Sequence, residues 1–227
     1  MSFPYAYLVG SLVFFLIWLA VFIVRRDLRK EILWASFLAM PFGLSEIFFV
    51  PEYWNPPSLF NLIDKIGFGI ESLLYTFSIG GLAAVSFEFV RGRKLQKIVA
   101  DRKLHIVPYI INILIYLGLE LVFPEQSIYN ASVSLLIGAG IIGYLRRDLI
   151  RQIIFSGFFF SFAYFVLFSI FNVLFPDFVK DVYSLDNFIG FSIIGVPIEE
   201  IIFAFSIGAF WSTLYEFMRG YRTKRVH

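Results

Sequence analysis

Seven apolar stretches, separated by short polar segments, dominate the chain. About 20 apolar residues suffice for a helix to cross a bilayer, so we expect each stretch to form a membrane-spanning helix. They cover residues 5–24, 31–50, 66–90, 104–123, 129–145, 152–175 and 188–218. The first has no cationic segment before it and no clear cleavage site, which favours a retained helix over a signal peptide.

Lysine and arginine occur almost entirely in every second connection. Residues 25–30, 91–103, 146–151 and 219–225 hold 17 of the 19 in the chain. Because positive charge collects on the cytoplasmic side of a membrane, we predict an outside N-terminus and a cytoplasmic C-terminus. The alternation also supports seven helices, since a missed helix would disrupt it.

An internal repeat relates the two ends of the chain. Residues 66–94 and 194–222 are near copies, 128 residues apart, and the run Arg25–Leu28 recurs as Arg146–Leu149. Self-similarity of this kind sets the architecture. Each copy ends a group of three predicted helices, and the extra helix between the groups restores the same orientation. The pattern therefore predicts parallel rather than inverted repeats.

The expected fold is an all-α polytopic membrane protein of two parallel three-helix repeats. We assign residues 1–95 to the first repeat, 96–126 to a linking transmembrane helix and 127–227 to the second repeat. This arrangement puts Glu71 and Glu199 at the same depth, facing a shared interior.

Composition supports the membrane assignment and excludes several kinds of site. The chain is 59% apolar, 20% aromatic and 16% charged, against roughly 25% charged residues in soluble domains. It has no cysteine, which excludes disulfides and thiol chemistry. Its two histidines, His105 and His227, leave no cluster for a metal or a serine–histidine–aspartate triad. We expect no metal site and no nucleic-acid partner.

Carboxylates inside apolar helices are costly and mark candidate functional sites. The densest group is Glu199 and Glu200, directly after Pro197-Ile198. Adjacent side chains point about 100° apart on a helix, so at most one faces the bundle centre squarely. The alternative is a helix start, where the dipole favours acids. Because both lie well inside the predicted helix 188–218, we favour a functional role.

Other polar residues fall at a similar depth. We interpret Glu71 as functional. For Glu46 and Glu120, a functional role and a position at the membrane interface fit the sequence equally well. Asn112 and Asn172 are read as hydrogen-bonding contacts between helices.

Two further acids repeat near the cytoplasmic ends. Glu88 and Glu216 stand one turn before Arg91 and Arg219, and we expect ion-paired helix ends.

The glycine run Gly138–Gly143 has the spacing of a dinucleotide fingerprint, but no strand precedes it and no acid follows at the required distance. It predicts close helix packing instead.

Aromatic side chains surround the glutamates along the sequence. Those placed to bind substrate and stabilise a cation are Tyr75, Phe77, Phe203, Phe205 and Trp211. Residues 51–57, with Tyr53 and Trp54, are interpreted as an interfacial aromatic belt and turn.

These residues resemble the integral-membrane lycopene cyclases of the heterodimeric or fused type, in which each half carries the pattern P-x-E-E-x-x-F-F. Pro197, Glu199, Glu200 and Phe203 match it, with Ala204 in place of the last aromatic residue. The resemblance covers the whole chain, because both the doubled domain and the length of the chain fit this family.

The first half matches the family less well. Trp54-Asn55-Pro56 looks similar to a W-x-N-P-like segment that precedes the motif, but the motif itself reads Gly69-Ile70-Glu71-Ser72. The proline and the second glutamate are absent, so we expect an asymmetric site in which the second half carries most of the chemistry.

The resemblance implies a lycopene β-cyclase-like isomerase in a membrane, the plasma membrane in a prokaryote. Its partner would be a linear carotenoid that enters from the lipid, alongside other carotenoid enzymes. Closing a ring gains and loses no electrons, so we expect no cofactor. The expected catalytic residues are Glu199, Glu200 and Glu71, with Glu46 and the aromatic group around the substrate.

The chemistry needs a protonated carboxyl, a carboxylate and a dry pocket. Burial and a neighbouring carboxylate keep one acid protonated, and a coupled group supplies acid and base together. Our hypothesis is that Glu199 or Glu200 donates a proton. The other, with Glu71, stabilises the carbocation and takes a proton back.

Two other functions fit the same features. Parallel repeats and intramembrane acids also suit a proton-coupled transporter, and the altered first motif suits a non-catalytic carotenoid or retinoid binder. A retinal Schiff-base protein is disfavoured because residues 188–218 contain no lysine.

Overall fold

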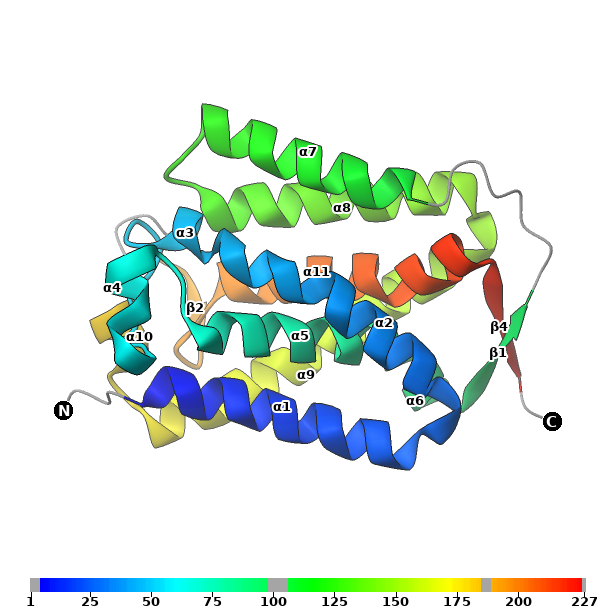
Figure 1. Cartoon of the computed structure of the whole chain (residues 1–227), viewed down its shortest axis with the longest axis horizontal. Helices are drawn as coiled ribbons and strands as arrows, with labels where there is room; N and C mark the ends of the chain where they lie inside the picture. Colours follow the sequence, from blue (N-terminus) through cyan, green and yellow to red (C-terminus); the bar gives the residue numbers. More distant parts are fainter. Residues whose placement is uncertain (1–4, 98–105, 185–188, 226–227) are drawn as a thin grey trace.

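Helices run side by side along the length of the molecule and account for nearly all of its regular structure (Figure 1). The computed structural model describes residues 5–97, 106–184 and 189–225. The helices are α1 (Ala6–Val24), α2 (Arg29–Ala39), α3 (Glu46–Phe49), α4 (Leu62–Ile66), α5 (Ile70–Ala84), α6 (Ser86–Arg91), α7 (Val107–Val122), α8 (Ser127–Leu145), α9 (Ile150–Leu174), α10 (Phe178–Val182) and α11 (Ile198–Arg219). Short 3-10 turns cover Arg26–Leu28, Met40–Ser45, Leu59–Asn61 and Arg147–Leu149. The predicted all-α membrane fold is confirmed.

Five helical segments of the described chain are long and apolar enough to cross a membrane. They are Ala6–Val24, Arg26–Phe49, Ser127–Leu145, Arg147–Leu174 and Ile198–Arg219. A sixth is reached if α4 and α5, bent by 94°, count as one span. The apolar helix α7 has only 16 residues. The count of seven, the repeat layout and the orientation stay predictions.

Three predicted helices differ from those observed. The stretch 31–50 breaks into a 3-10 turn at Met40, where Pro41 follows and removes a backbone donor. The stretch 66–90 begins with the α4–α5 bend and breaks again at Val85. The stretch 188–218 becomes helical only at Ile198, after Pro197. The predicted starts at residues 104 and 188 lie outside the described residues.

Helix α11 is the centre of the bundle. It packs extensively on α9 and α8 and also on α5, while α5 packs on α1 and α2. Helix α7 packs mainly on α8 at the edge of the molecule (Figure 1). The residues of α11 from Ser206 to Phe217 are all buried, so this helix holds the two halves together.

Short β-pairings connect parts that are distant in sequence. Strand β1 (Arg93–Lys97) pairs antiparallel with β4 (Tyr221–Arg225), which joins the chain after α6 to the chain after α11. Strands β2 (Ser192–Ile193) and β3 (Val196–Pro197) form a small hairpin before α11. A single bridge joins Trp54 to Tyr183. None of these pairings was predicted.

Small residues set the closest helix contacts. A Cβ on Gly80 would collide with Ala39 of α2, and a Cβ on Gly208 would collide with the Ser156 carbonyl oxygen of α9. These glycines occupy matching places in the two Ser-Ile-Gly runs. In the glycine run of α8, Gly138 lies against Phe210 of α11, which fits the packing role expected from sequence.

We expect Gly208→Ala to destabilise the protein by about 1–3 kcal/mol, because the backbone of α9 must move to admit the methyl group. Gly140→Ala is the matched control, since a Cβ there meets nothing within 4 Å. Thermal unfolding in detergent measures both. A Gly208→Ala protein as stable as the Gly140→Ala protein would contradict the close contact.

The expected ion pairs at the helix ends are not formed. Glu88 and Glu216 are fully buried, and the described residues place no arginine or lysine nitrogen within 4.0 Å of either carboxylate. Arg91 instead lies over the ring of Phe155, with 4.5 Å from its guanidinium carbon to the ring centroid.

Candidate active site

A cavity of about 230 Å³ lies at the end of the bundle where α3, α4 and α10 are found. We call it the main cavity. Most of its wall is apolar and aromatic. The side chains in the wall that carry a hydroxyl or carboxyl group are Tyr7, Ser11, Ser45, Glu46, Tyr53, Ser72, Tyr75, Thr76, Tyr164, Tyr183 and Glu200. Only two carboxyl groups, Glu46 and Glu200, are among them.

Glu200 stands in the first turn of α11 and receives three phenol donors. Tyr53 and Tyr183 donate to Oε1 at 2.7 and 3.1 Å, and Tyr164 donates to Oε2 at 2.8 Å. The side chain is 5% exposed. Burying a carboxylate is costly, and three hydrogen bonds offset more of that cost than a single one. The donors come from α9 and from two loops, so tertiary contacts hold Glu200 in place.

The phenols stay protonated beside this acid. Burial raises the pKa of Tyr53 and of Tyr183 well above the usual range for tyrosine, and the charge of Glu200 raises each pKa further. Both groups therefore act as hydrogen-bond donors to Glu200 throughout the physiological pH range.

Glu199 points elsewhere. Its Oε1 accepts hydrogen bonds from the Tyr129 hydroxyl at 2.8 Å and from the backbone N–H of Ile189 at 2.7 Å. It does not line the main cavity. Glu199 thus fixes the segment before α11 to α8, and the roughly 100° between adjacent helical side chains separates its direction from that of Glu200.

Glu46 is the second carboxyl group in the cavity wall. It begins α3 and accepts hydrogen bonds from the Tyr7 hydroxyl at 3.0 Å and from the backbone N–H of Gly69 at 2.8 Å. The Ser72 hydroxyl also contacts it. Tyr7 lies 2.9 Å from the Ser72 hydroxyl as well, so Tyr7, Glu46 and Ser72 form one hydrogen-bonded group.

Glu71 repeats the behaviour of Glu199. Its Oε1 accepts the backbone N–H of Leu59 at 2.7 Å, while its Oε2 is buried without a partner. It does not line the main cavity. In both halves, the first glutamate of the motif holds the loop before its helix.

The second motif position differs between the halves. In the second half it is Glu200, and in the first half it is Ser72. Glu46 contacts Ser72 from a neighbouring helix. A carboxyl group therefore stands beside the cavity in both halves, although only one comes from the motif.

The prediction that Glu199 and Glu200 lie well inside a helix was wrong. Glu71, Glu199 and Glu200 all lie in the first turn of their helices, where the helix dipole favours an acid. The apolar run before Ile198 is loop and hairpin rather than helix. The dipole contributes to their stability, and the cavity rather than the depth distinguishes Glu200 from the other two.

The predicted aromatic residues divide into two groups. Tyr75 and Phe203 line the main cavity, and Trp211 lines a smaller adjoining cavity of about 90 Å³. Phe77 packs instead on Trp18, with ring centroids 5.0 Å apart, and Phe205 packs on Phe158 at 5.1 Å. Neither lines either of these two cavities, so they are not placed to touch a substrate there.

The remaining polar predictions have separate partners. Glu120 accepts hydrogen bonds from Ser127 at 3.0 Å and Asn130 at 3.1 Å, which tie α7 to α8. Asn172 donates to the carbonyl oxygen of Gly195. Asn112 lines the smaller cavity.

Sequence reasoning missed the tyrosines of the site. Tyr7, Tyr53, Tyr164 and Tyr183 were not singled out as functional. Tyr53 carried the one available signal, because it stands directly before the Trp54-Asn55-Pro56 segment. Trp54 in turn packs on Tyr7 and Tyr183, with ring centroids 4.7 and 5.8 Å apart, and so connects the surroundings of the two carboxyl groups.

Comparison with known proteins gives one family. The family model for lycopene cyclase matches residues 126–218, which include α8, α9 and nearly all of α11. The comparisons with curated proteins and with solved structures give no match.

Proposed function

We propose that this chain, whose residues 126–218 match the family model for lycopene cyclase, closes the linear end group of a carotene into a ring by acid–base catalysis in the main cavity. The observation that carries the proposal is the pair Glu46 and Glu200. They are the carboxyl groups in the wall of a largely apolar cavity, and they come from different halves of the chain.

The reaction is an isomerisation with a balanced exchange of protons. A proton adds to the terminal double bond of the end group and leaves a tertiary carbocation. A neighbouring double bond attacks this cation, which forms a carbon–carbon bond and moves the charge into the ring. Loss of one ring proton restores a double bond. No electron is gained or lost, and the product has the formula of the substrate.

Glu46 is the proposed proton donor. The Ser72 hydroxyl touches Glu46, and it can turn either to donate to the carboxylate or to accept from the carboxylic acid. Tyr7 lies within hydrogen-bond distance of both groups, so it can donate to Ser72 when Glu46 is protonated. The group therefore accommodates both protonation states of Glu46.

Glu200 is the proposed carboxylate. Its three phenol donors stabilise the charged form, and the negative charge faces the cavity in which the cation forms. It then removes the ring proton. The faces of Tyr75 and Phe203, also in the wall, stabilise the passing cation through their π-electrons.

An apolar wall also protects the intermediate. Water in the cavity would capture a tertiary cation as an alcohol. Phenylalanines from α1, α9 and α11 form much of the wall. The hydroxyls of Tyr53, Tyr164 and Tyr183 already bond to Glu200, which reduces the number of partners left for ordered water. The site thus favours proton loss over hydration.

The cavity holds one end of the substrate at a time. Its volume of about 230 Å³ lies below the roughly 300–1,000 Å³ of pockets that enclose a drug-sized ligand, and a carotene is longer than such a ligand. The rest of the polyene must lie outside. Val9 and Val13 of α1 and Ile170 and Leu174 of α9 line the cavity and are also exposed, so lateral access from the lipid runs between α1 and α9.

Gly10 lines the cavity, and a Cβ added there would lie 3.4 Å from the ring of Phe171 in α9. Access between α1 and α9 therefore predicts that a larger side chain at Gly10 slows the reaction. We expect Gly10→Leu to lower the rate of cyclisation by roughly tenfold or more, because the side chain fills the passage. Gly118→Leu is the matched control, since a Cβ there meets nothing within 4 Å. Equal rates for the two variants would contradict access at this place.

The remaining assignments belong to the same proposal. The N-terminus lies outside and the C-terminus in the cytoplasm, with the main cavity near the outer surface. The ring is of the β type, and other carotenoid enzymes supply the linear substrate and accept the product.

Expression in lycopene-accumulating bacteria tests the function. Pigment analysis should show cyclic carotenes in place of lycopene. Unchanged lycopene in cells that contain folded protein would contradict the proposal. Lycopene that co-purifies unconverted would identify a carotenoid-binding protein instead.

A further inference from the structure

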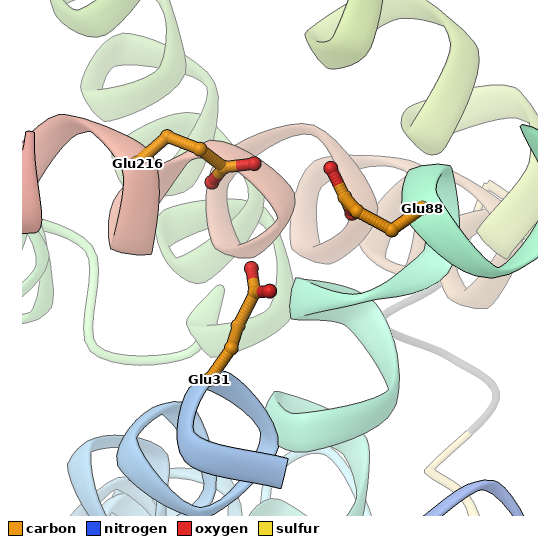
Figure 2. A group of neighbouring side chains, drawn as sticks. All are labelled: Glu31, Glu88 and Glu216. Carbon is orange, nitrogen blue, oxygen red and sulfur yellow. The ribbon is translucent and has the colours of Figure 1, made fainter. Parts of the chain in front are cut away.

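Three glutamates meet at the end of the bundle opposite the main cavity. Glu31 comes from α2, Glu88 from α6 and Glu216 from α11, and their side chains point toward one another (Figure 2). One carboxylate oxygen from each lies within 4.8 Å of the others. None is more than 1% exposed. We call these three residues the acidic cluster; the proposed cyclisation makes no use of them.

A buried amide holds two of the three carboxylates. Gln152 of α9 donates through Nε2 to Glu216 at 2.6 Å and to Glu88 at 3.4 Å. Its own carbonyl oxygen Oε1 has no hydrogen-bond partner, although the residue is only 2% exposed. Gln152 thus contacts the cluster through its amide nitrogen and has a buried, unused carbonyl oxygen on the same amide group.

Glu31 gives an independent sign of a missing ligand. Neither of its carboxylate oxygens has a hydrogen-bond partner, yet the side chain is 1% exposed and points at the gap between Glu88 and Glu216 (Figure 2). A buried polar group without a partner is costly. Something that binds oxygen is needed at this position.

Nearby positive charge does not meet the need. Arg25 and Arg146, the arginines at the ends of α1 and α8, lie 2.9 and 2.7 Å from Asp27 and Asp148. Arg25 also donates to the backbone carbonyl of Glu88 at 2.9 Å, but in the described part of the chain no lysine or arginine nitrogen comes within 4.0 Å of a carboxylate oxygen of the three glutamates. The carboxylates therefore stand together without a protein cation.

We propose that the acidic cluster binds a hard divalent cation. Calcium takes oxygen ligands at about 2.3–2.6 Å, so two ligands on opposite sides of the ion stand roughly 4.6–5.2 Å apart. The chosen carboxylate oxygens of the cluster lie within 4.8 Å of one another, which fits this span. Small shifts of the side chains would bring the oxygens close enough for the shorter bonds of manganese or magnesium. The three carboxylates supply ligands of the type these ions prefer.

The ion would join the two halves of the protein. Glu31 and Glu88 belong to the first half, and Glu216 and Gln152 to the second. A bound cation adds its binding free energy to the folded state, in which these four groups are together. This role concerns assembly of the bundle and goes beyond the proposed cyclisation.

Manganese chloride alone is the probe that tests the site. Purified protein is freed of metal with a chelator and titrated with Mn²⁺, while electron paramagnetic resonance reports the free ion and thermal unfolding reports stability. We expect one saturable site per chain and a rise in the melting temperature. No carotene is present, so the result is independent of the catalytic proposal.

Two variants and a control locate the ion. Glu31→Gln and Glu216→Gln should each weaken Mn²⁺ binding by roughly tenfold or more, since the loss of even an outer-shell partner costs 10–100-fold. Glu125→Gln, at an exposed glutamate, should bind like the unaltered protein. The absence of saturable binding in the unaltered protein would overturn the proposal, and so would unchanged affinity in both cluster variants.

Discussion

Replacement of Glu200 by glutamine is expected to reduce the rate of carotene cyclisation by about 10²–10⁴-fold, the usual contribution of a general acid or base. Glutamine keeps the size of the side chain, and its amide oxygen can still accept hydrogen bonds from Tyr53 and Tyr183 while its NH2 group donates to the Tyr164 hydroxyl. It cannot take a proton from the ring, and it places no negative charge beside the cation. Product formed per unit of purified protein, measured by chromatography, gives the rate.

Glu199→Gln is the control for this change, because it alters the neighbouring carboxylate without touching the cavity wall. Glutamine can still accept the hydrogen bonds from Tyr129 and Ile189, so activity should remain within a few-fold of the unaltered protein. If Glu199→Gln abolished activity while Glu200→Gln preserved it, the two roles would have to be exchanged.

Replacement of Glu46 by glutamine is the second large effect that we expect, again about 10²–10⁴-fold. The variant lacks the proposed proton donor, whereas the contacts with Tyr7 and Gly69 can still form. Substrate binding should be largely retained, so the loss appears in kcat rather than in KM.

Glu120→Gln is the matched control for Glu46. Both glutamates are 5% exposed, and Glu120 also accepts hydrogen bonds from a serine and a second donor, but it does not line the main cavity. It should keep near-normal activity. Equal losses in Glu46→Gln and Glu120→Gln would indicate a general effect of removing buried charge.

Apolar length predicts the straight helices well. The predicted stretches 5–24 and 152–175 lie within two residues of the observed helical boundaries at each end. Periodicity fails where an apolar loop adjoins a helix, as it does before Ile198. Residues 189–195 of this loop are exposed, and the loop is held by the β2–β3 pairing and by Glu199; neither contact is visible in hydropathy.

Helical geometry would have improved the choice of aromatic residues. Side chains two residues apart on a helix point in directions about 200° apart. Tyr75 and Phe77 therefore cannot face the same cavity. Ser72, Tyr75 and Thr76 share a face by their spacing, and all three line the main cavity. The same spacing relates Glu200 to Phe203.

The contacts of Glu200 could not be predicted from one sequence. Tyr53 and Tyr183 lie in loops that come together through the pairing of Trp54 with Tyr183. Their positions depend on tertiary structure rather than on any local pattern. The acidic cluster was missed for a similar reason, because Glu31 stands at the start of a predicted helix, where an acid is ordinary.

The most direct test of the central claim is the mass of the product formed in D₂O. Purified protein in lipid vesicles is supplied with lycopene in deuterated buffer, and the carotenes are analysed by mass spectrometry. Proton donation from an exchangeable carboxyl group predicts one deuterium incorporated for each ring closed, and cyclic product formed about 10²–10⁴-fold more slowly by Glu200→Gln. Cyclic product that carries no deuterium would contradict the account.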